Sequence, residues 1–200
     1  MKDLGVAKKI LDMSIVKNKE ISSLKISQAK YIKKVLEKFS MADAKPRSTP
    51  FGIQLNLSNP QSPKMEKDEE QMAKIPYASE VDSLMYAMLY TGPYIAQAVE
   101  VVSRFISNLD KYHWEGVKWL LRYLKSTSEV CLGYSKKEPD PKGFADANLG
   151  GCEDLGKSTT GYVFTIGDTA ISWMSRLQKS VALKVTETEY MSSAEEVVYG

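Results

Sequence analysis

Two carboxylates near the end of the chain have the types and spacing of a divalent-metal site. Asp146 lies on the short apolar run 143–148, and Glu189 opens a helical pattern that follows two further strand-like runs. A carboxylate on a strand and another on a facing helix can each bind Mg²⁺, which prefers hard oxygen ligands in octahedral positions. Two such ions about 4 Å apart support phosphodiester cleavage, because one activates water and the other stabilises the leaving oxygen. A site of that kind needs more than two acids, and the sequence reaches Gly200 without supplying them.

The elements that must position these carboxylates follow from the local pattern. Strand-like residues occupy three runs in this part of the chain: 143–148, 160–166 and 169–174. Gly167-Asp168 separates the last two runs, and such a dipeptide is typical of a two-residue β-hairpin turn. A helical pattern begins near Glu187. We therefore expect three strands, the first holding Asp146, followed by a helix that holds Glu189.

The overall composition is that of an ordinary globular chain and makes no case for a charged partner. Lys and Arg total 27 against 25 for Asp and Glu, so only local clusters of charge could favour nucleic acid. No run approaches the roughly 20 apolar residues that a membrane helix needs, and we expect no membrane partner. Cys131 and Cys152 have no metal-ligand spacing and no secretory leader before them. This favours a reducing, intracellular environment, cytoplasmic or nuclear.

Residues 1–50 predict a β-hairpin followed by a helix. Apolar positions alternate in 7–16 and again in 21–26, on either side of a polar stretch. Ser27 is expected to cap a helix that runs to about Phe39. One face of this helix carries a set of lysines: Lys30, Lys33, Lys34 and Lys38. They are either the solvated face of an amphipathic helix or contacts for a nucleic-acid backbone.

Residues 51–76 predict a linker. Proline recurs at positions 60, 63 and 76, and a charged run covers 64–70. Such a composition breaks regular structure and favours mobility over a docked loop. We expect the linker to join two halves that pack separately.

Residues 77–130 predict a three-helix bundle. Apolar residues recur with helical spacing in 77–91, 95–106 and 114–124, with short breaks between these segments. The last helix has a basic edge that contains Lys118, Arg122 and Lys125. Aromatic residues are interleaved with it: Tyr112, Trp114, Trp119 and Tyr123. Such residues either track a nucleic-acid strand and stack on its bases, or the aromatic side chains belong to the core.

Other enzyme classes find no support. His113 is the one histidine of the chain, and a histidine at a helix start is more often a cap or packing residue than a catalytic base. The sequence has no glycine-rich phosphate loop after a predicted strand and no zinc-ligand cluster.

Several stretches together resemble, in their order and spacing, the Pol polyprotein of copia-type retrotransposons, from the late reverse transcriptase into ribonuclease H. They are Met1-Lys2-Asp3-Leu4-Gly5, Ala44-Lys45-Pro46-Arg47-Ser48-Thr49-Pro50, Ser83-Leu84-Met85-Tyr86, Ser103-Arg104-Phe105, Leu121-Arg122-Tyr123-Leu124-Lys125, Lys157-Ser158-Thr159-Thr160-Gly161-Tyr162-Val163 and Ile171-Ser172-Trp173. The resemblance implies that 1–50 ends the palm region, that 77–130 is thumb or connection, and that 142–200 opens a ribonuclease H-like domain. The expected fold is thus α+β: a β-hairpin and helix, a linker, a three-helix bundle, and a truncated ribonuclease H-like α/β start.

The same resemblance gives the two carboxylates a role. Asp146 matches the family's first metal-binding aspartate and Glu189 the helical glutamate that follows, with Mg²⁺ as the family's cofactor and RNA–DNA hybrid or single-stranded nucleic acid as partner. The polymerase aspartates would lie before Met1, and the third ribonuclease H aspartate beyond Gly200.

The chain departs from the family where its pattern is tight. Asp-Ala-Asp reads Asp146-Ala147-Asn148, and the glycine of Val-Gly-Ser-Leu is Asp82, on a helix expected to pack on both sides. We therefore expect an inactive fragment whose parent copies RNA into DNA and degrades the RNA of the hybrid. Two alternatives stay open: a non-catalytic nucleic-acid-binding module that uses the basic helices, or a reading frame that continues past Gly200 and completes the enzyme.

Overall fold

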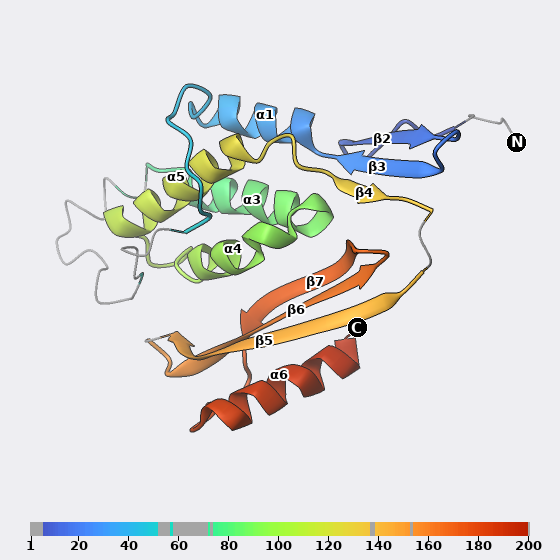
Figure 1. The fold of residues 1–200 in the computed structure, drawn as a ribbon. Coiled ribbons are helices and arrows are strands. Elements are labelled where there is room, and N and C mark those ends of the chain that lie inside the picture. Colours follow the sequence, from blue (N-terminus) through green and yellow to red (C-terminus); the bar gives the residue numbers. More distant parts are fainter. Residues whose placement is uncertain are drawn as a thin grey trace, which may run out of the picture.

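The protein is a mixed α+β chain with two antiparallel sheets, and its layers are visible in Figure 1. The computed structural model describes residues 6–51, 57, 72, 74–136, 139–152 and 154–199, and the side chains of these up to residue 195. One group of helices lies above the sheet β5-β6-β7, and helix α6 lies beneath it. The sheet that carries Asp146 is therefore covered on both faces.

The first sheet contains the predicted hairpin and two further strands. Its order is β1-β2-β3-β4, with every pair antiparallel. The strands are β1 (Lys9–Ile10), β2 (Met13–Asn18), β3 (Ser23–Ser27) and β4 (Leu132–Tyr134). The pairing of Ile15 with Ile26 confirms the hairpin. The sequence did not predict β4, which returns to this sheet only after the helices.

Four helices share one hydrophobic core. They are α1 (Ala29–Lys38), α3 (Tyr77–Thr91), α4 (Ala96–Ser103, after the 3₁₀ turn Pro93–Ile95) and α5 (Lys111–Ser126). The three helices predicted in 77–130 are confirmed. Ile32 of α1 packs in the same cluster as Leu84 and Leu120, so the expectation that the two halves pack separately is wrong. Their apolar stripes are complementary, and burying them together removes more apolar surface from water than separate packing would.

Most of the predicted linker, and the motif at 1–5, lie outside the described residues. Within 51–76, the described residues Phe51, Leu57 and Ile75 pack against the helical core. At the start of α1, Ser27 accepts a hydrogen bond from the backbone N of Ala29 (3.2 Å), although Gln28 is the residue directly before the helix.

The second sheet and its helix match the predicted order. The elements are β5 (Pro141–Cys152), β6 (Lys157–Ile166), β7 (Thr169–Leu177) and α6 (Val185–Tyr199). The strand order is β5-β6-β7. Gly167 and Asp168 both have positive φ (55° and 68°), as a two-residue turn of the primed type requires, which confirms the hairpin.

Polar contacts join the helical layer to this sheet. The indole Nε1 of Trp173 donates to the backbone O of Met88 (3.0 Å). The hydroxyl of Tyr134, on β4, donates to the backbone O of Ala170 on β7 (3.1 Å). The two sheets and the helices therefore form one connected body.

His113 and Asp82 show how local chemistry decides burial. The Nδ1 of His113 accepts a hydrogen bond from the backbone N of Asp110 (2.9 Å), and its buried ring stacks on Phe105 at 4.0 Å between centroids. This confirms the cap and packing role. Asp82 is exposed on α3, so the expectation that its charge enters a packed face is wrong: α3 has one solvent-facing side.

No described helix is long and apolar enough to cross a membrane.

Glu80 is the buried acid of the helical core, and it predicts a pH dependence of stability. Its side chain is 2% exposed, and its Oε2 has no hydrogen-bond partner in the described part of the chain. Burial raises the pKa of Glu80 from 4.5 to about 8, although Lys118 and Lys38 oppose the increase.

Because the folded state keeps this proton to a higher pH than the unfolded chain does, stability should fall as pH rises from about 4.5 to about 8. We expect the free energy of unfolding in urea to drop by on the order of 5 kcal/mol over this window. Glu80→Gln should remove most of the drop, whereas Glu129→Gln, at an exposed site, should not. An identical pH profile for the two variants would contradict the assignment.

Candidate active site

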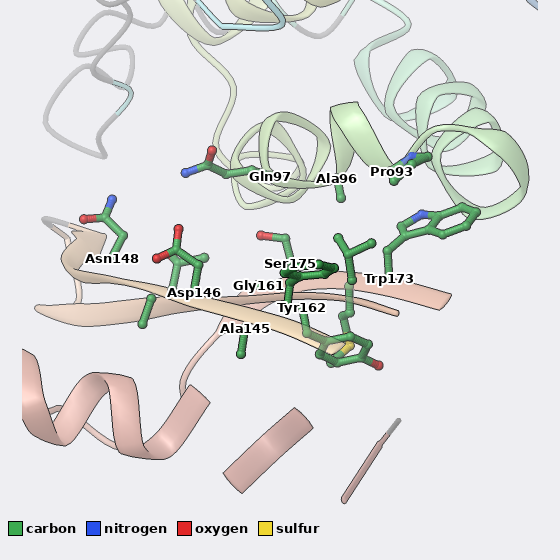
Figure 2. A pocket seen from close by; sticks show the side chains of 15 residues that line it. Pro93, Ala96, Gln97, Ala145, Asp146, Asn148, Gly161, Tyr162, Trp173 and Ser175 are labelled. Atoms are coloured by element: carbon green, nitrogen blue, oxygen red, sulfur yellow. The ribbon is translucent and has the colours of Figure 1, made fainter. Parts of the chain in front are cut away.

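Asp146 lies near the middle of β5, with its carboxylate on the face of the sheet that the helical layer covers. Side chains alternate between faces along a strand, so Phe144, Asp146 and Asn148 share one face. Figure 2 shows Asp146 and Asn148 directed toward Gln97 of α4, and Ala145 directed to the opposite side. The side chain of Asp146 is exposed.

A cavity of about 300 Å³ separates this face from α4. Its polar lining includes Gln97 on the helix and Asp146, Asn148 and Ser175 on the sheet (Figure 2). Thr159 of the sheet also lines it. Phe144 and Trp173 add aromatic surface, and Phe144 is 58% exposed. A concave site with apolar walls and a few convergent polar groups is the usual form of a ligand site.

Glu189 lies on α6, on the other side of the sheet from this cavity (Figure 1). The hydroxyl of Ser192, one turn further along α6, donates to the backbone O of Asp146 (2.9 Å). The turn of α6 that carries Glu189 is thus held against the backbone of Asp146, with the Glu189 side chain exposed. Within the described residues, no hydrogen bond or ion pair joins the two carboxylates.

Polar side chains hold α6 on the sheet. The amide Nε2 of Gln178 donates to the hydroxyl of Thr160 and to the backbone O of Thr188, both at 3.0 Å. Thr188 also meets the hydroxyl of Ser158 at 3.3 Å, and all four residues are buried. Since buried polar groups favour geometries that satisfy them, this network fixes the register of α6 more tightly than apolar contact alone would.

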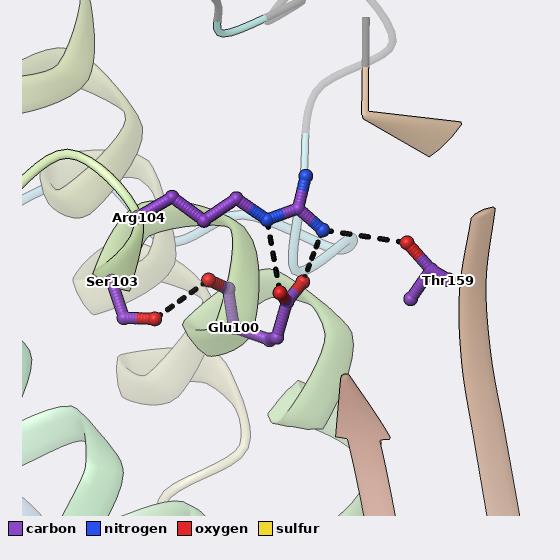
Figure 3. Close-up of polar contacts among 4 residues, drawn as sticks. All are labelled: Glu100, Ser103, Arg104 and Thr159. Carbon is purple, nitrogen blue, oxygen red and sulfur yellow. Dashed lines mark hydrogen bonds and ion pairs between the residues drawn. The ribbon is translucent and has the colours of Figure 1, made fainter. Parts of the chain in front are cut away.

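A second polar contact joins α4 to the sheet beside the cavity. Figure 3 shows Arg104 bridging Glu100 and Thr159. The guanidinium donates to both carboxylate oxygens of Glu100 (2.9 and 2.5 Å), and its Nη2 also donates to the Thr159 hydroxyl (3.3 Å). Both charged side chains are 14% exposed, so the pair is largely shielded from water. It positions Thr159, which lines the cavity.

The oxygen donors around Asp146 fit Mg²⁺ chemistry. The ion is commonly bound through one or two carboxylates while it keeps several waters. Here one carboxylate, Asp146, shares the cavity with the amides of Asn148 and Gln97. The described residues contain no group of three or more His, Cys, Asp or Glu placed to hold a metal.

The predicted nucleic-acid contacts fall into two sets. Lys30, Lys33 and Lys125 line one surface depression between α1 and α5, together with Glu37 and Glu129. Within this set, Lys33 lies 4.0 Å from Glu37 and the Nζ of Lys125 donates to the backbone O of Ala44 (3.0 Å). The other predicted cations lie elsewhere: Lys34 is 4.0 Å from Asp12, and Lys118 forms an ion pair with Glu115 and lies 5.8 Å from the Trp114 ring centroid. The Nε of Arg122 is buried and has no hydrogen-bond partner in the described part of the chain.

Two residues of the cavity region were not predicted. Gln97 gave no signal, because an exposed amide on an amphipathic helix is ordinary. Arg104 appeared only within a family motif, without a role. Its contact with Thr159 joins residues 55 positions apart, which no local pattern reveals.

Comparisons with known proteins place the chain among transposon sequences. It is 52% identical over 195 residues to the retrovirus-related Pol polyprotein from transposon TNT 1-94 of Nicotiana tabacum, covering 98% of this chain and 15% of that protein. It is 33% identical over 174 residues to the corresponding polyprotein from transposon RE1 of Arabidopsis thaliana, covering 86% of this chain and 11% of that protein. An uncharacterized mitochondrial protein of Arabidopsis thaliana, AtMg00810, is 33% identical over 198 residues, and the match covers 97% of this chain and 77% of that protein. No family model and no solved structure matches.

The contact between α6 and β5 can be tested at two adjacent serines. Ser192→Ala removes the hydrogen bond to the backbone of Asp146, which should lower the free energy of unfolding by about 1 kcal/mol and speed amide exchange in α6. Ser193→Ala is the matched control, because that exposed hydroxyl bonds only to Glu189 O within the same helix. Equal stability and exchange in the two variants would contradict the proposed anchoring.

Proposed function

Because the chain belongs to the Pol polyproteins of copia-type retrotransposons, we propose that it joins the end of a reverse transcriptase to the start of a ribonuclease H domain. The identity of 52% over 98% of the chain is the observation that carries the proposal. The chain spans 15% of that relative, so RNA-directed DNA synthesis and hybrid cleavage are proposed for the parent protein.

Asp146 and Glu189 are the proposed metal ligands of the ribonuclease H part. In the described residues β5 is an edge strand, and the turn of α6 next to Ser192 touches the backbone of Asp146. The two carboxylates start from opposite sides of the sheet (Figure 1 and Figure 2), so a shared ion would require them to meet around this edge strand. Mg²⁺ bound there would supply Lewis-acid stabilisation of a phosphodiester oxygen.

Residues of this chain would orient a nucleic-acid strand beside that site. The amides of Gln97 and Asn148 face the cavity and can donate to phosphate or ribose oxygens. Arg104, which is paired with Glu100, joins the end of α4 to Thr159 of the sheet.

We further propose that a protein of these 200 residues does not cleave hybrid by itself. Two-ion cleavage uses several carboxylates to seat both ions. Asp146 and Glu189 are the two that this region offers, and Asn148 provides a neutral amide where the family motif has an acid. A single weakly held ion is the expected result.

A second function, passive binding of nucleic acid, is favoured by the clustering of Lys30, Lys33 and Lys125 around one depression. Cations on two adjacent helices can follow a phosphate backbone without reading its bases. In the parent protein the same cluster would help to position the RNA–DNA hybrid. Passive binding is therefore compatible with the first proposal, and it is also a function that this segment could have alone.

These proposals predict binding of an RNA–DNA hybrid without cleavage. Fluorescence anisotropy with a labelled hybrid should show an affinity that falls steeply with salt. Replacing Lys30, Lys33 and Lys125 together by Gln should weaken binding and lower the salt slope by roughly 2 to 3. The control variant replaces the exposed Lys17, Lys25 and Lys179 by Gln, so that it has the same net charge as the first variant. It should weaken hybrid binding less than the first variant does.

Cleavage is measured in the same samples with Mg²⁺ or Mn²⁺. Cleavage that disappears in Asp146→Asn would contradict the proposed inactivity and indicate a completed metal site. No binding at low salt would contradict both proposed functions, and equal losses in the two lysine variants would remove the role of the α1–α5 cluster.

A further inference from the structure

Three tyrosine rings form a row across the surface where α1 meets α3. The ring centroids of Tyr31 and Tyr86 lie 4.8 Å apart, and those of Tyr86 and Tyr90 also lie 4.8 Å apart. Tyr86 and Tyr90 are one turn apart on α3, and Tyr31 comes from α1. All three side chains are half-buried, so each ring packs on the protein and still reaches solvent. We call this set the tyrosine row.

Hydrogen bonds fix two of the three rings. The hydroxyl of Tyr31 donates to the backbone O of Ser83 (3.1 Å). The hydroxyl of Tyr86 donates to the backbone O of Leu11 in the turn between β1 and β2 (2.6 Å). Rings held in this way lose little further conformational entropy when a ligand packs on them.

The surface around the tyrosine row is more apolar than a solvated helix face needs to be. Leu11 is 58% exposed and Leu89, on the turn of α3 before Tyr90, is 61% exposed. Met85 adds a further exposed apolar side chain at 38%. An exposed apolar patch of this kind marks an interaction surface more often than isolated apolar residues do.

Lysines accompany the tyrosine row along α1. Lys34 and Lys38 follow Tyr31 at helical spacing and lie on the same side of the helix. The Nζ of Lys38 bonds to the hydroxyl of Ser79 (2.9 Å), one turn before Ser83 on α3. Lys30 and Lys33 belong to the separate depression between α1 and α5.

Acidic groups near the tyrosine row do not cancel this charge. Asp12 forms an ion pair with Lys9 and lies 4.0 Å from Lys34, and Lys33 lies 4.0 Å from Glu37. Asp82, one turn before Tyr86, is exposed. Three lysines (Lys9, Lys34 and Lys38) therefore face two acids (Asp12 and Asp82).

We propose that the tyrosine row is a stacking platform for the bases of single-stranded nucleic acid, whose phosphates contact the lysines of α1. Aromatic rings beside a basic stripe are the combination that binds single strands without sequence preference, because every base has a stacking face. A duplex hides those faces, so the platform distinguishes an unpaired strand from a paired one. This inference rests on the proposed nucleic-acid function, and it adds a second surface, separate from Asp146, that takes the unpaired part of the strand.

Tyr90→Leu tests the platform, because it keeps an apolar side chain and removes the stacking ring. Anisotropy with a labelled 20-nucleotide single strand should show binding about tenfold weaker than that of the wild type. Binding of the RNA–DNA hybrid should stay unchanged. Tyr190→Leu is the matched control, since Tyr190 is a 78% exposed tyrosine on α6, outside the tyrosine row, and should leave the single-strand affinity unchanged.

Lys34→Gln provides a second, independent readout. It should lower the salt slope of single-strand binding by about 1, as expected for one lost phosphate contact. Circular dichroism of each variant verifies that the fold is retained.

Each outcome decides between the two proposals. Wild-type affinity for the single strand in Tyr90→Leu, or binding that is insensitive to salt, would overturn the platform and favour a protein partner for this patch. Hybrid binding without single-strand binding would overturn the platform alone. Binding of neither would remove the proposed function together with it.

Discussion

The pairing register of β5 on β6 is the constraint on which the rest of the site depends. Asp146 lies opposite Gly161, and this register places its carboxylate on the face below α4 while its backbone O meets α6. A slip of one residue would move every side chain of β5 to the other face and bury the carboxylate against α6. A contact between the two strands opposes such a slip, because the backbone N of Gly150 on β5 donates to the hydroxyl of Ser158 on β6 (3.2 Å).

The helical layer and the sheet depend on each other for the shape of the cavity. Trp173 bonds to α3, and Arg104 bonds to Thr159, so both contacts link residues of the sheet to the helices. Helix α4 forms one wall of the cavity and brings Gln97 to the same cavity as Asp146. The sequence around Gln97 predicts only an amphipathic helix. The site is therefore formed by both the helical layer and the sheet.

Much of the fold could be predicted from the sequence, because the signals were local. Helical spacing identified α3, α4 and α5, and Gly167-Asp168 identified the turn between β6 and β7. Strand β4 has three residues, too few to show alternation, and its partner is more than a hundred positions away.

Local sequence patterns were not enough to predict on which side of the sheet each carboxylate lies. Periodicity predicts that Asp146 is on a strand and Glu189 on a helix, but it does not say which face of the sheet the helix covers. The burial of Thr188 and Ser192 shows which side of α6 lies against the sheet. A sequence pattern does not identify small polar residues such as these as buried positions.

The most direct test of this account is the position of a bound metal ion. Backbone amide spectra recorded with substoichiometric Mn²⁺, whose unpaired electrons broaden nearby signals, locate the ion without any need for catalysis. The account predicts broadening centred on Asp146 and on residues 188–192 of α6, and its loss in Asp146→Asn. Broadening that avoids β5, or that is unchanged in Asp146→Asn, would contradict a metal site that includes Asp146.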